Sequence, residues 1–316
     1  MFFSVIIPVY NRPKELHELL NSLTGQLFDD FEVIIIEDGS DLKSENLIAD
    51  FSSSLNIKYY YQANQGQGFA RNTGVKMATG HYFVFFDSDC IIPPTYFTTL
   101  YKAILERKLD AFGGPDAAED SFSVLQKAID FSMTSFWTTG GIRGKGSAPA
   151  KYQARGFNMG FSRNVYDEVG GFLDPNKGED IEISIRIRKA GFKLELIEEA
   201  FVYHKRRNTL ASFFRQSFSF GQNRVNVARF HPGAIKLVHL MPLAFFLGLL
   251  ALLGTYLFNL SIFSLFLGLY LVWSIGLFIS ALTASKSIAV AALALVTSYG
   301  QLISYGIGLL LALIRR

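Results

Sequence analysis

Apolar and polar positions alternate in two ways along the first 110 residues. Short β-branched and aromatic runs, typical of buried strands, are separated by segments in which apolar residues recur every three or four positions, as on one face of a helix. The predicted strands cover residues 3–9, 32–37, 57–61 and 82–86. Because strands that alternate with helices form a mostly parallel sheet with helices on its faces, we expect an α/β domain.

The helix expected after the first strand has clear start signals. Asn11 suits the N-cap, Pro13 suits the first turn, and leucines at 16, 19, 20 and 23 fall on one face. A second helix is predicted near 179–190 and a strand near 193–197. Between them, residues 138–156 are rich in glycine and small residues, which predicts a loop. This loop either closes over a substrate or is a plain surface connection.

The C-terminal part of the chain is apolar almost throughout. Between residues 237 and 314 the only fully charged side chain is Lys286, and three apolar runs cover 237–258, 260–282 and 287–314. Each run is long enough to cross a membrane as a helix, and three in succession exceed what the core of a soluble domain needs. The predicted organisation is a catalytic domain at 1–203, a basic amphipathic interface segment at 204–236, and a membrane domain of about three helices at 237–316.

Charge is distributed unevenly, although the net charge is only +3. All 27 acidic side chains precede residue 204, whereas residues 204–236 hold seven Lys or Arg and no acid. A basic segment beside a span is typical of the cytoplasmic side and suits anionic lipid headgroups, so we favour lipid over nucleic acid as its partner. Three spans would leave Arg315 and Arg316 outside, against the positive-inside preference, so the third segment need not span fully.

Two further features favour a cytoplasmic catalytic domain. Residues 1–10 are apolar but short, lack a basic leader and contain Pro8, which favours a strand over a signal peptide. The single cysteine, Cys90, excludes an intrachain disulfide and agrees with a reducing compartment. We therefore expect an integral membrane protein with its catalytic domain on the cytoplasmic side.

Acidic residues follow two of the predicted strands. Asp38 ends the second strand and precedes a glycine, where a carboxylate can accept hydrogen bonds from a base or a ribose. Asp87 and Asp89 follow the strand at 82–86, and two carboxylates one residue apart at a sheet edge can hold a divalent cation that binds a diphosphate. Such oxygen ligands suit Mg²⁺ or Mn²⁺, although solvated turn acids give the same pattern.

Two other segments have both a functional and a structural interpretation. Glu179 and Asp180 begin a predicted helix, where acids commonly interact with the helix dipole, but such an acid can also remove the proton of an acceptor. The segment 66–72 lacks the third glycine of a dinucleotide-binding fingerprint because Arg71 stands there. We expect a turn that leads into a helix whose first turn presents Arg71 and Asn72 to an anion.

The order of these segments resembles a known enzyme family. The chain contains, in sequence, VIIPVYNRPKEL, EDGS, NQGQGFARNTGVKMATG, FFDSD, RGFNMGFSR and GGFLDPNKGEDIEISIRIRKAG. These blocks resemble the ordered signature blocks of the family-2 glycosyltransferases over about residues 3–230. The resemblance implies a GT-A-like fold with a mixed, mostly parallel sheet flanked by helices, a nucleotide-diphosphate sugar donor, a divalent metal (Mn²⁺ or Mg²⁺) and inversion at the anomeric carbon.

The resemblance also implies how the donor is bound. By position, Pro8, Tyr10 and Asp38 would line the base and ribose pocket, with Arg71 and Asp87 as further nucleotide-binding residues.

Metal and catalytic residues follow in the same way. Asp87 and Asp89 match the D-x-D acids, with Asp89 as the stronger metal candidate, and His204 lies where many relatives have a histidine near the metal or the diphosphate. Asp180 matches the catalytic base, and the adjacent Glu179 is the alternative.

The segment after His204 fits a membrane-anchored branch of the family. Residues 215–224 resemble a block of exopolysaccharide and lipid-linked oligosaccharide transferases, but Phe220 replaces the usual tyrosine. The chain also lacks the Gln-x-x-Arg-Trp block of processive synthases, so polymer synthesis is not expected. Four residues are candidates for the acceptor or the diphosphate: Arg206, Arg207, Gln216 and Arg224.

The implied activity is sugar transfer, with a UDP-sugar favoured, to a hydroxyl of a lipid-linked or cell-surface glycan. A polyprenyl-phosphate sugar transferase is the nearest alternative, but its anionic acceptor needs no base, and the carboxylates at 179–180 would repel it. A membrane scaffold with an inactive transferase domain is a third hypothesis, which the acids at 38, 87, 89 and 180 disfavour.

Overall fold

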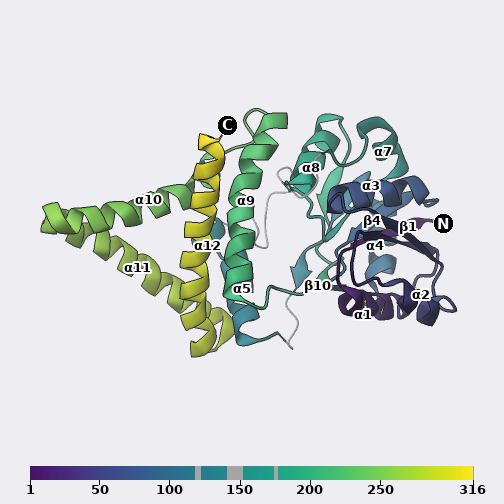
Figure 1. Cartoon of the computed structure of the whole chain (residues 1–316), viewed down its shortest axis with the longest axis horizontal. Coiled ribbons are helices and arrows are strands. Elements are labelled where there is room, and N and C mark those ends of the chain that lie inside the picture. Colours follow the sequence, from purple (N-terminus) through teal and green to yellow (C-terminus); the bar gives the residue numbers. More distant parts are fainter. Residues whose placement is uncertain (118–121, 141–151, 174–176, 316) are drawn as a thin grey trace. The chain divides into compact units, whose positions relative to one another are not determined.

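The chain folds into two compact units (Figure 1). The structure, a computed structural model, describes residues 1–117, 122–140, 152–173 and 177–315. Most of the loop predicted at 138–156 lies outside these residues. The first unit combines Met1–Ala117 with Ala148–Lys205, and the second combines Ala118–Ser147 with Arg206–Arg316.

The first unit is built on a seven-stranded sheet with the order β3-β2-β1-β4-β8-β6-β9. Only β8 runs antiparallel to its neighbours β4 and β6, while the other described pairings are parallel. The sequence prediction of a mixed, mostly parallel sheet is therefore confirmed. The strands are β1 Phe3–Val9, β2 Phe31–Asp38, β3 Ile57–Gln62, β4 Tyr82–Phe86, β6 Ala111–Gly113, β8 Asn158–Ser162 and β9 Leu194–Leu196.

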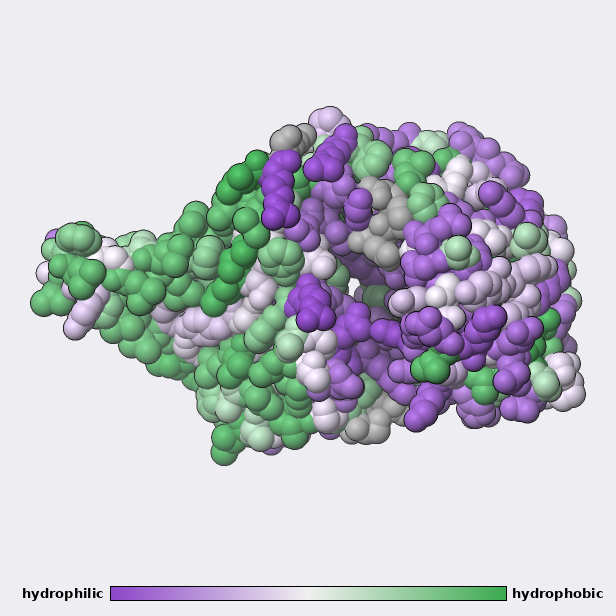
Figure 2. All heavy atoms as spheres, viewed as in Figure 1, coloured by the Kyte–Doolittle hydropathy of each residue, from purple (hydrophilic) through white to green (hydrophobic). Residues whose placement is uncertain are grey.

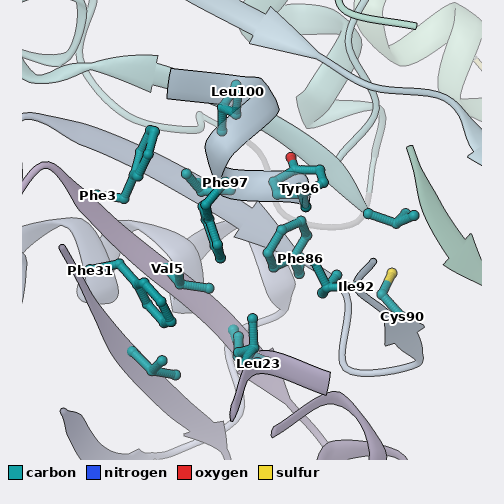
Figure 3. Close-up of a cluster of buried hydrophobic side chains, with 14 of the residues drawn as sticks. Phe3, Val5, Leu23, Phe31, Phe86, Cys90, Ile92, Tyr96, Phe97 and Leu100 are labelled. Atoms are coloured by element: carbon teal, nitrogen blue, oxygen red, sulfur yellow. The ribbon is translucent and has the colours of Figure 1, made fainter. Parts of the chain in front are cut away.

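Helices cover both faces of this sheet, as the apolar runs predicted. Successive residues of β1 point to opposite faces, so Val5 and Ile7 join one core and Ile6 joins the other. Figure 3 shows the first core, where Phe3 and Phe86 surround Phe97, with ring centroids 5.4 and 6.3 Å away. The helices are α1 Pro13–Thr24, α2 Glu45–Phe51, α3 Gln67–Met77, α4 Tyr96–Arg107, α7 Arg163–Val169 and α8 Glu179–Lys189.

A second, three-stranded sheet brings distant parts of the chain together. It consists of β5 (Cys90–Ile91), β10 (Val202–His204) and β7 (Asp116–Ala117), in the order β5-β10-β7. β10 pairs antiparallel with β5, and His204 is the partner of Cys90. This pairing fixes the residues that follow β4 beside the end of β10.

The N-cap predicted for α1 is wrong. Arg12 is in the N-cap position and no side chain caps the helix. Asn11 instead adopts a left-handed backbone conformation with a φ of 54°. Its Oδ1 accepts hydrogen bonds from the backbone N–H groups of Asp41 and Leu42, at 2.9 and 3.0 Å. Asn11 therefore joins the loop after β1 to the loop after β2, a long-range role that local capping preferences do not reveal.

The second unit is helical. It contains α5 Val124–Thr134, α6 Phe136–Thr139, α9 Leu210–Phe230, α10 Leu237–Phe258, α11 Leu260–Ser285 and α12 Ile288–Ile314. The last three are long and apolar enough to cross a membrane, as the sequence predicted, and hydrophobic residues predominate on the face of these helices that Figure 2 shows. The structure groups α5, α6 and α9 with these three helices, whereas the sequence had put residues 124–139 in the catalytic domain and 204–236 in a separate segment.

Glycines let α9 and α12 approach closely. A Cβ atom on Gly221 of α9 would lie 2.2 Å from the carbonyl oxygen of Tyr305, and one on Gly308 of α12 would lie 2.1 Å from that of Phe218. Both contacts are with backbone, which cannot move aside as a flexible side chain can. Gly221 therefore has a packing role within the block at 215–224.

Candidate active site

The candidate site lies at the edge of the large sheet where parallel strands end. Tyr10, Asp38 and Asp87 directly follow or end β1, β2 and β4, which run parallel and adjacent in the order β2-β1-β4. Carboxyl ends of parallel strands meet at one edge, which is where such sheets bind ligands. The Tyr10 side chain is exposed and Pro8 is half-buried. The predicted nucleotide-binding residues thus share one edge of the fold.

Asp38 holds the loop after β3. Its Oδ1 accepts hydrogen bonds from Nε2 of Gln62 (2.7 Å) and the N–H of Gln65 (3.0 Å), while Oδ2 accepts from the N–H of Gly66 (2.8 Å). The side chain is buried as a result. Gly39 follows with a φ of 77°, and a Cβ there would lie 2.6 Å from the backbone nitrogen of Asn64. The Asp-Gly pair therefore fixes the loop after β3 at this edge of the sheet.

Arg71 joins two of the predicted acids. Its guanidinium is fully buried, with Nη2 2.7 Å from Oδ1 of Asp87 and Nη1 3.0 Å from Oε1 of Glu179. Nη2 also donates to the carbonyl of Gly156 at 3.3 Å. A Cβ on Gly156 would lie 2.8 Å from that same nitrogen, so glycine is needed for this approach. Arg71 thus links the acid after β4 to the start of α8.

The prediction that Arg71 and Asn72 lie in the first turn of a helix is wrong, whereas the contact of Arg71 with a nucleotide stays a prediction. α3 begins at Gln67, so both residues lie beyond its first turn. Asn72 forms a reciprocal pair of hydrogen bonds with the backbone of Phe172, at 2.7 and 2.8 Å. Arg71 and Asn72 thus form ion pairs and hydrogen bonds with segments far away in the sequence. A local motif does not indicate such contacts.

Glu179 and Asp180 differ in environment, although they are neighbours at the start of α8. Glu179 is buried and also accepts a 2.6 Å hydrogen bond from Nε2 of Gln67. Burial raises the pKa of Glu179, which Arg71 partly offsets and the nearby Asp180 reinforces. Asp180 is only half-buried, and its Oδ2 accepts a long hydrogen bond, 3.3 Å, from the N–H of Gly156. Of the two acids, Asp180 has the more accessible carboxylate.

Asp89 lies between two cationic or basic groups. Oδ2 is 2.5 Å from Nη1 of Arg12, and Oδ1 is 3.2 Å from Nε2 of His204. The N–H of Lys205 also donates to the carbonyl of Asp89 at 3.2 Å. Burial acts to raise the pKa of Asp89, but the charges and hydrogen bonds of His204 and Arg12 outweigh it and hold the pKa below its usual range. Asp89 is therefore a carboxylate near neutral pH.

Asp89, Cys90 and His204 offer ligand atoms within 4.8 Å of one another. The donor set fits a hard divalent cation through the oxygen of Asp89 and the nitrogen of His204. Cys90 fits less well, because burial and the charges of Asp89 and Asp87 raise its pKa well above the usual value and keep the thiol neutral. Asp89 and His204 are thus the residues that could hold a metal.

Several residues of this site were missed by the sequence analysis. Arg12 follows β1 at the same sheet edge as the acids, which was a usable signal. No sequence signal indicated Gln67, because its contact with Glu179 joins segments far apart in the chain. No signal indicated Phe157 either, whose ring stacks on the imidazole of His204 with centroids 4.6 Å apart. The pairing of β5 with β10 is what brings His204 to Asp89.

The four candidates for the acceptor or the diphosphate belong to the second unit. Arg206 is buried, and its Nη2 lies 2.6 Å from Oδ1 of Asp130 in α5. This ion pair connects α5 with the segment before α9, and the role of Arg206 toward an acceptor or a diphosphate stays a prediction. Arg207 precedes α9, and Gln216 and Arg224 lie on it. The roles of these three stay predictions.

Comparisons with known proteins identify the family of the chain. Residues 4–170 match the profile of the family described as glycosyl transferase family 2. The glycosyltransferase AglE of Haloferax volcanii is 27% identical over 244 residues, which cover 72% of this chain and 74% of AglE. Other curated glycosyltransferases are 34% to 39% identical over 108 to 111 residues, and the chain spans only 16% to 32% of their length.

Solved structures share the fold. The mannosyltransferase PcManGT from Pyrobaculum calidifontis, in complex with GDP-Man and Mn²⁺, superposes with a TM-score of 0.70 and 19% identity, over 98% of this chain and 86% of that one. Staphylococcus aureus TarS, in complex with UDP-GlcNAc, gives a TM-score of 0.50 and 19% identity, over 73% of this chain and 71% of that one. The profile match extends over more than half of the 316 residues. The chain therefore belongs to the glycosyl transferase family 2.

Proposed function

We propose that the protein is an inverting glycosyltransferase that moves a sugar from a nucleotide-diphosphate donor to a hydroxyl group of a lipid-linked or cell-surface glycan. The observation that carries the proposal is the buried Arg71, which joins Asp87 to Glu179, the residue beside Asp180. Through this arginine, the acid suited to the donor is connected to the start of α8, which carries Asp180. Inversion needs such an arrangement, because donor and acceptor must react in a single displacement.

Asp180 is the proposed general base. A hydroxyl that attacks an anomeric carbon must lose its proton, and a half-buried carboxylate can accept it. Glu179 is less suited to this role because Arg71 and Gln67 already engage its carboxylate. We assign Glu179 instead to positioning: it anchors the first turn of α8, which presents Asp180.

Asp89 and His204 are the proposed ligands of Mn²⁺ or Mg²⁺. The bound cation would offset negative charge on the departing nucleotide diphosphate. Arg12 adds a second positive charge beside Asp89, and Phe157 restrains the imidazole of His204 by stacking. PcManGT, whose fold this chain shares, is described in complex with Mn²⁺, which supports the choice of a divalent metal.

The donor would bind along the edge formed by Pro8, Tyr10 and Asp38, with Tyr10 offering an exposed ring to the base. A UDP-sugar is our first candidate. The two structural neighbours differ on this point, because TarS is described with UDP-GlcNAc and PcManGT with GDP-Man. A panel of UDP- and GDP-sugars is therefore the appropriate starting set.

The basic segment before α10 supports a catalytic domain on the cytoplasmic side and an acceptor supplied from the membrane. Its charges include Arg215 and Arg229, both exposed on α9.

The test uses the full-length protein in detergent with a panel of sugar nucleotides, Mn²⁺ and a membrane lipid extract, and it measures release of the nucleotide diphosphate. Asp180→Asn should lower turnover by about 10²–10⁴-fold while nucleotide binding persists. Asp167→Asn is the matched control, because Asp167 is an exposed acid of the nearby α7. It should retain full turnover.

Other outcomes point elsewhere. Near wild-type turnover of Asp180→Asn, with a product that carries the sugar on polyprenyl phosphate, would favour the phosphate-acceptor reaction, in which no base is needed. Absence of any metal-dependent stabilisation by nucleotide in the wild-type protein would favour an inactive scaffold.

A further inference from the structure

Asp89 and His204 are held beside each other by backbone pairing. β5 and β10 pair antiparallel, with His204 opposite Cys90, and the N–H of Lys205 donates to the carbonyl of Asp89 at 3.2 Å. The side chains of Asp89 and His204 are only 14% and 16% exposed. Because neither residue can shift far without opening this small sheet, their two side chains form a fixed pair.

The spacing of this pair suits a single cation. Oδ1 of Asp89 lies 3.2 Å from Nε2 of His204. Two ligands at right angles around a cation, each about 2.1 Å from it, are about 3.0 Å apart. The fixed pair therefore needs almost no rearrangement to bind a divalent ion, and any barrier to binding must come from another group.

Arg12 reaches Asp89 from a different part of the fold. It follows β1 and is in the N-cap position of α1, where its carbonyl accepts the N–H of Leu16 at 3.0 Å. The preceding residue, Asn11, is tied to the loop after β2 by two hydrogen bonds. The backbone of Arg12 is thus anchored, whereas its side chain is long and 33% exposed. Arg12 can therefore change its rotamer without a movement of α1.

The two arginines that pair with the D-x-D acids differ in how firmly they are held. Arg71 is fully buried and contacts Asp87, Glu179 and a backbone carbonyl. Arg12 is partly exposed, and Asp89 is the only acid that it contacts among the residues that the structure describes. Movement of Arg71 would break several buried contacts, but movement of Arg12 breaks one ion pair. Of the two, Arg12 is the one built to move.

Arg12 already neutralises Asp89 in the free protein, where Nη1 is 2.5 Å from Oδ2. A divalent cation on the same carboxylate has two possibilities. Either Arg12 stays and repels it, or Arg12 leaves and its charge-assisted hydrogen bond is lost. Repulsion between the two charges within about 5 Å, or loss of such a bond, lowers the affinity for the cation by about tenfold or more.

The diphosphate of a sugar nucleotide reverses this balance. Arg12 lies two residues after Tyr10, at the sheet edge where we place the donor, and Asp89 follows the neighbouring strand β4. A doubly negative diphosphate is a stronger partner for a guanidinium than one carboxylate, and the planar fork of arginine suits phosphate oxygens. With the diphosphate present, the charges of cation and guanidinium are compensated together.

We propose that Arg12 couples binding of the divalent cation to binding of the sugar nucleotide. In the free protein Arg12 occupies the carboxylate of Asp89 and keeps the affinity for the cation low. When the nucleotide binds, Arg12 moves from this carboxylate to the diphosphate, and Asp89 and His204 become available to the cation. The inference rests on the proposed function, because it takes Asp89 and His204 as the metal ligands, but it holds whatever sugar is transferred.

Binding of Mn²⁺ to the full-length protein in detergent tests this coupling without any turnover. Free Mn²⁺ is measured by its electron paramagnetic resonance signal, alone and with whichever of UDP and GDP binds more tightly. The titrations are corrected for the complex that Mn²⁺ and nucleotide form without protein. The ratio of the two dissociation constants for Mn²⁺ is the coupling. In the wild type, Mn²⁺ should bind at least about tenfold more tightly when the nucleotide is present.

Three variants isolate the charge of Arg12. Arg12→Gln removes the charge, and it leaves the start of α1 intact because no side chain caps this helix. Arg12→Gln should bind Mn²⁺ alone about tenfold more tightly than the wild type, or better, and its coupling should fall by the same factor. Arg12→Lys keeps the charge and should bind Mn²⁺ alone as weakly as the wild type. Lys14→Gln is the matched control, since it removes an exposed positive charge two residues away, and it should equal the wild type in both titrations.

The direction of the change separates coupling from a purely structural role. If Arg12 only held Asp89 in place, its removal would leave Mn²⁺ binding unchanged or weaker, and either result would overturn the proposal. Asp89→Asn shows whether the measured Mn²⁺ is at this site. If Asp89→Asn binds Mn²⁺ as the wild type does, the metal ligands of the proposed function are wrong, and the role of Arg12 is wrong with them. If Asp89→Asn loses Mn²⁺ while Arg12→Gln keeps the wild-type coupling, only the role of Arg12 is wrong.

Discussion

Replacement of Arg71 by methionine tests the network that connects the two parts of the site. Methionine keeps much of the length of the side chain but removes the charge. The guanidinium is fully buried between Asp87 and Glu179, and the Glu179 side chain is only 4% exposed. Without Arg71, Glu179 becomes a buried carboxylate with no countercharge. Breaking a buried ion pair in this way typically costs about 3–5 kcal/mol, so Arg71→Met should lower the free energy of unfolding of the first unit by about that amount.

Hydrogen exchange of the full-length protein in detergent measures this cost. The slowest amides of β1, β2 and β4 report the opening of the sheet, and a loss of about 4 kcal/mol corresponds to exchange faster by about a thousandfold. Arg107→Met is the matched control, because Arg107 is 40% exposed and its nearest carboxylate oxygens are 3.7 and 4.0 Å away. Exposed pairs of this kind contribute about 0–1 kcal/mol, so the control should exchange almost as the wild type.

A double variant tests the physical cause. Glu179→Gln in addition to Arg71→Met removes the unpaired charge, so most of the lost stability should return. The pH dependence has a definite sign. Burial raises the pKa of Glu179 and Arg71 lowers it, so in Arg71→Met this pKa rises further. The cost should therefore shrink as the pH falls and Glu179 takes up a proton. A cost below about 1 kcal/mol, or a double variant less stable than Arg71→Met, would refute the reasoning.

Three other predictions concern separate parts of the molecule. Asp89→Asn should abolish turnover and Mn²⁺-dependent nucleotide binding in calorimetric titrations while the fold is kept; full wild-type activity in excess EDTA would contradict the metal. Glu32 is buried, and its Oε2 lies 2.7 Å from Nζ of Lys58, and its pKa is lowered from 4.5 to about 2. The stabilisation that results, about 3 kcal/mol, is complete above pH 4.5 and is lost as the pH falls toward 2. Glu32→Gln should thus destabilise the protein at pH 7 and much less at pH 3, and a pH-independent difference would argue against this. Gly221→Ala should lower the melting temperature in detergent, because its Cβ would meet the carbonyl oxygen of Tyr305 at 2.2 Å, and overpacking typically costs about 1–3 kcal/mol. An unchanged melting temperature would show that α9 can shift without loss.

The acids of the site could be predicted because their positions are local features. Asp38 and Asp87 directly end or follow strands whose apolar runs identify them, and parallel strands bring their carboxyl ends to one edge. What these acids contact could not be predicted in the same way. Asp38 accepts hydrogen bonds from the loop after β3, and Asp87 pairs with an arginine of α3. Both contacts depend on how the loops close, which the strand pattern leaves undetermined.

The choice between Glu179 and Asp180 shows the same limit. Glu179 and Asp180 are adjacent carboxylic acids at a helix start, so local sequence does not distinguish their roles. Only the match to the family favoured Asp180 as the base. The structure separates them by burial: Glu179 faces Arg71 and Gln67, while Asp180 is half-buried. A helix turns by about 100° per residue, so two neighbours at the start of α8 face different surroundings.

The sequence by itself determined five strands of the first unit (β1, β2, β3, β4 and β9), its helices α1 and α8, the acids at the ends of its strands, and the three long apolar helices. Each of these follows from the period or the length of a local run, because side chains alternate in a strand and recur every 3.6 residues in a helix. Only the tertiary structure decided that Arg71 is buried between two acids, that β10 brings His204 to Asp89, and that α5 and α9 cover the polar face of α12. These features join residues far apart in the chain, and their stability comes from burial and charge pairing between segments, which a local pattern does not contain.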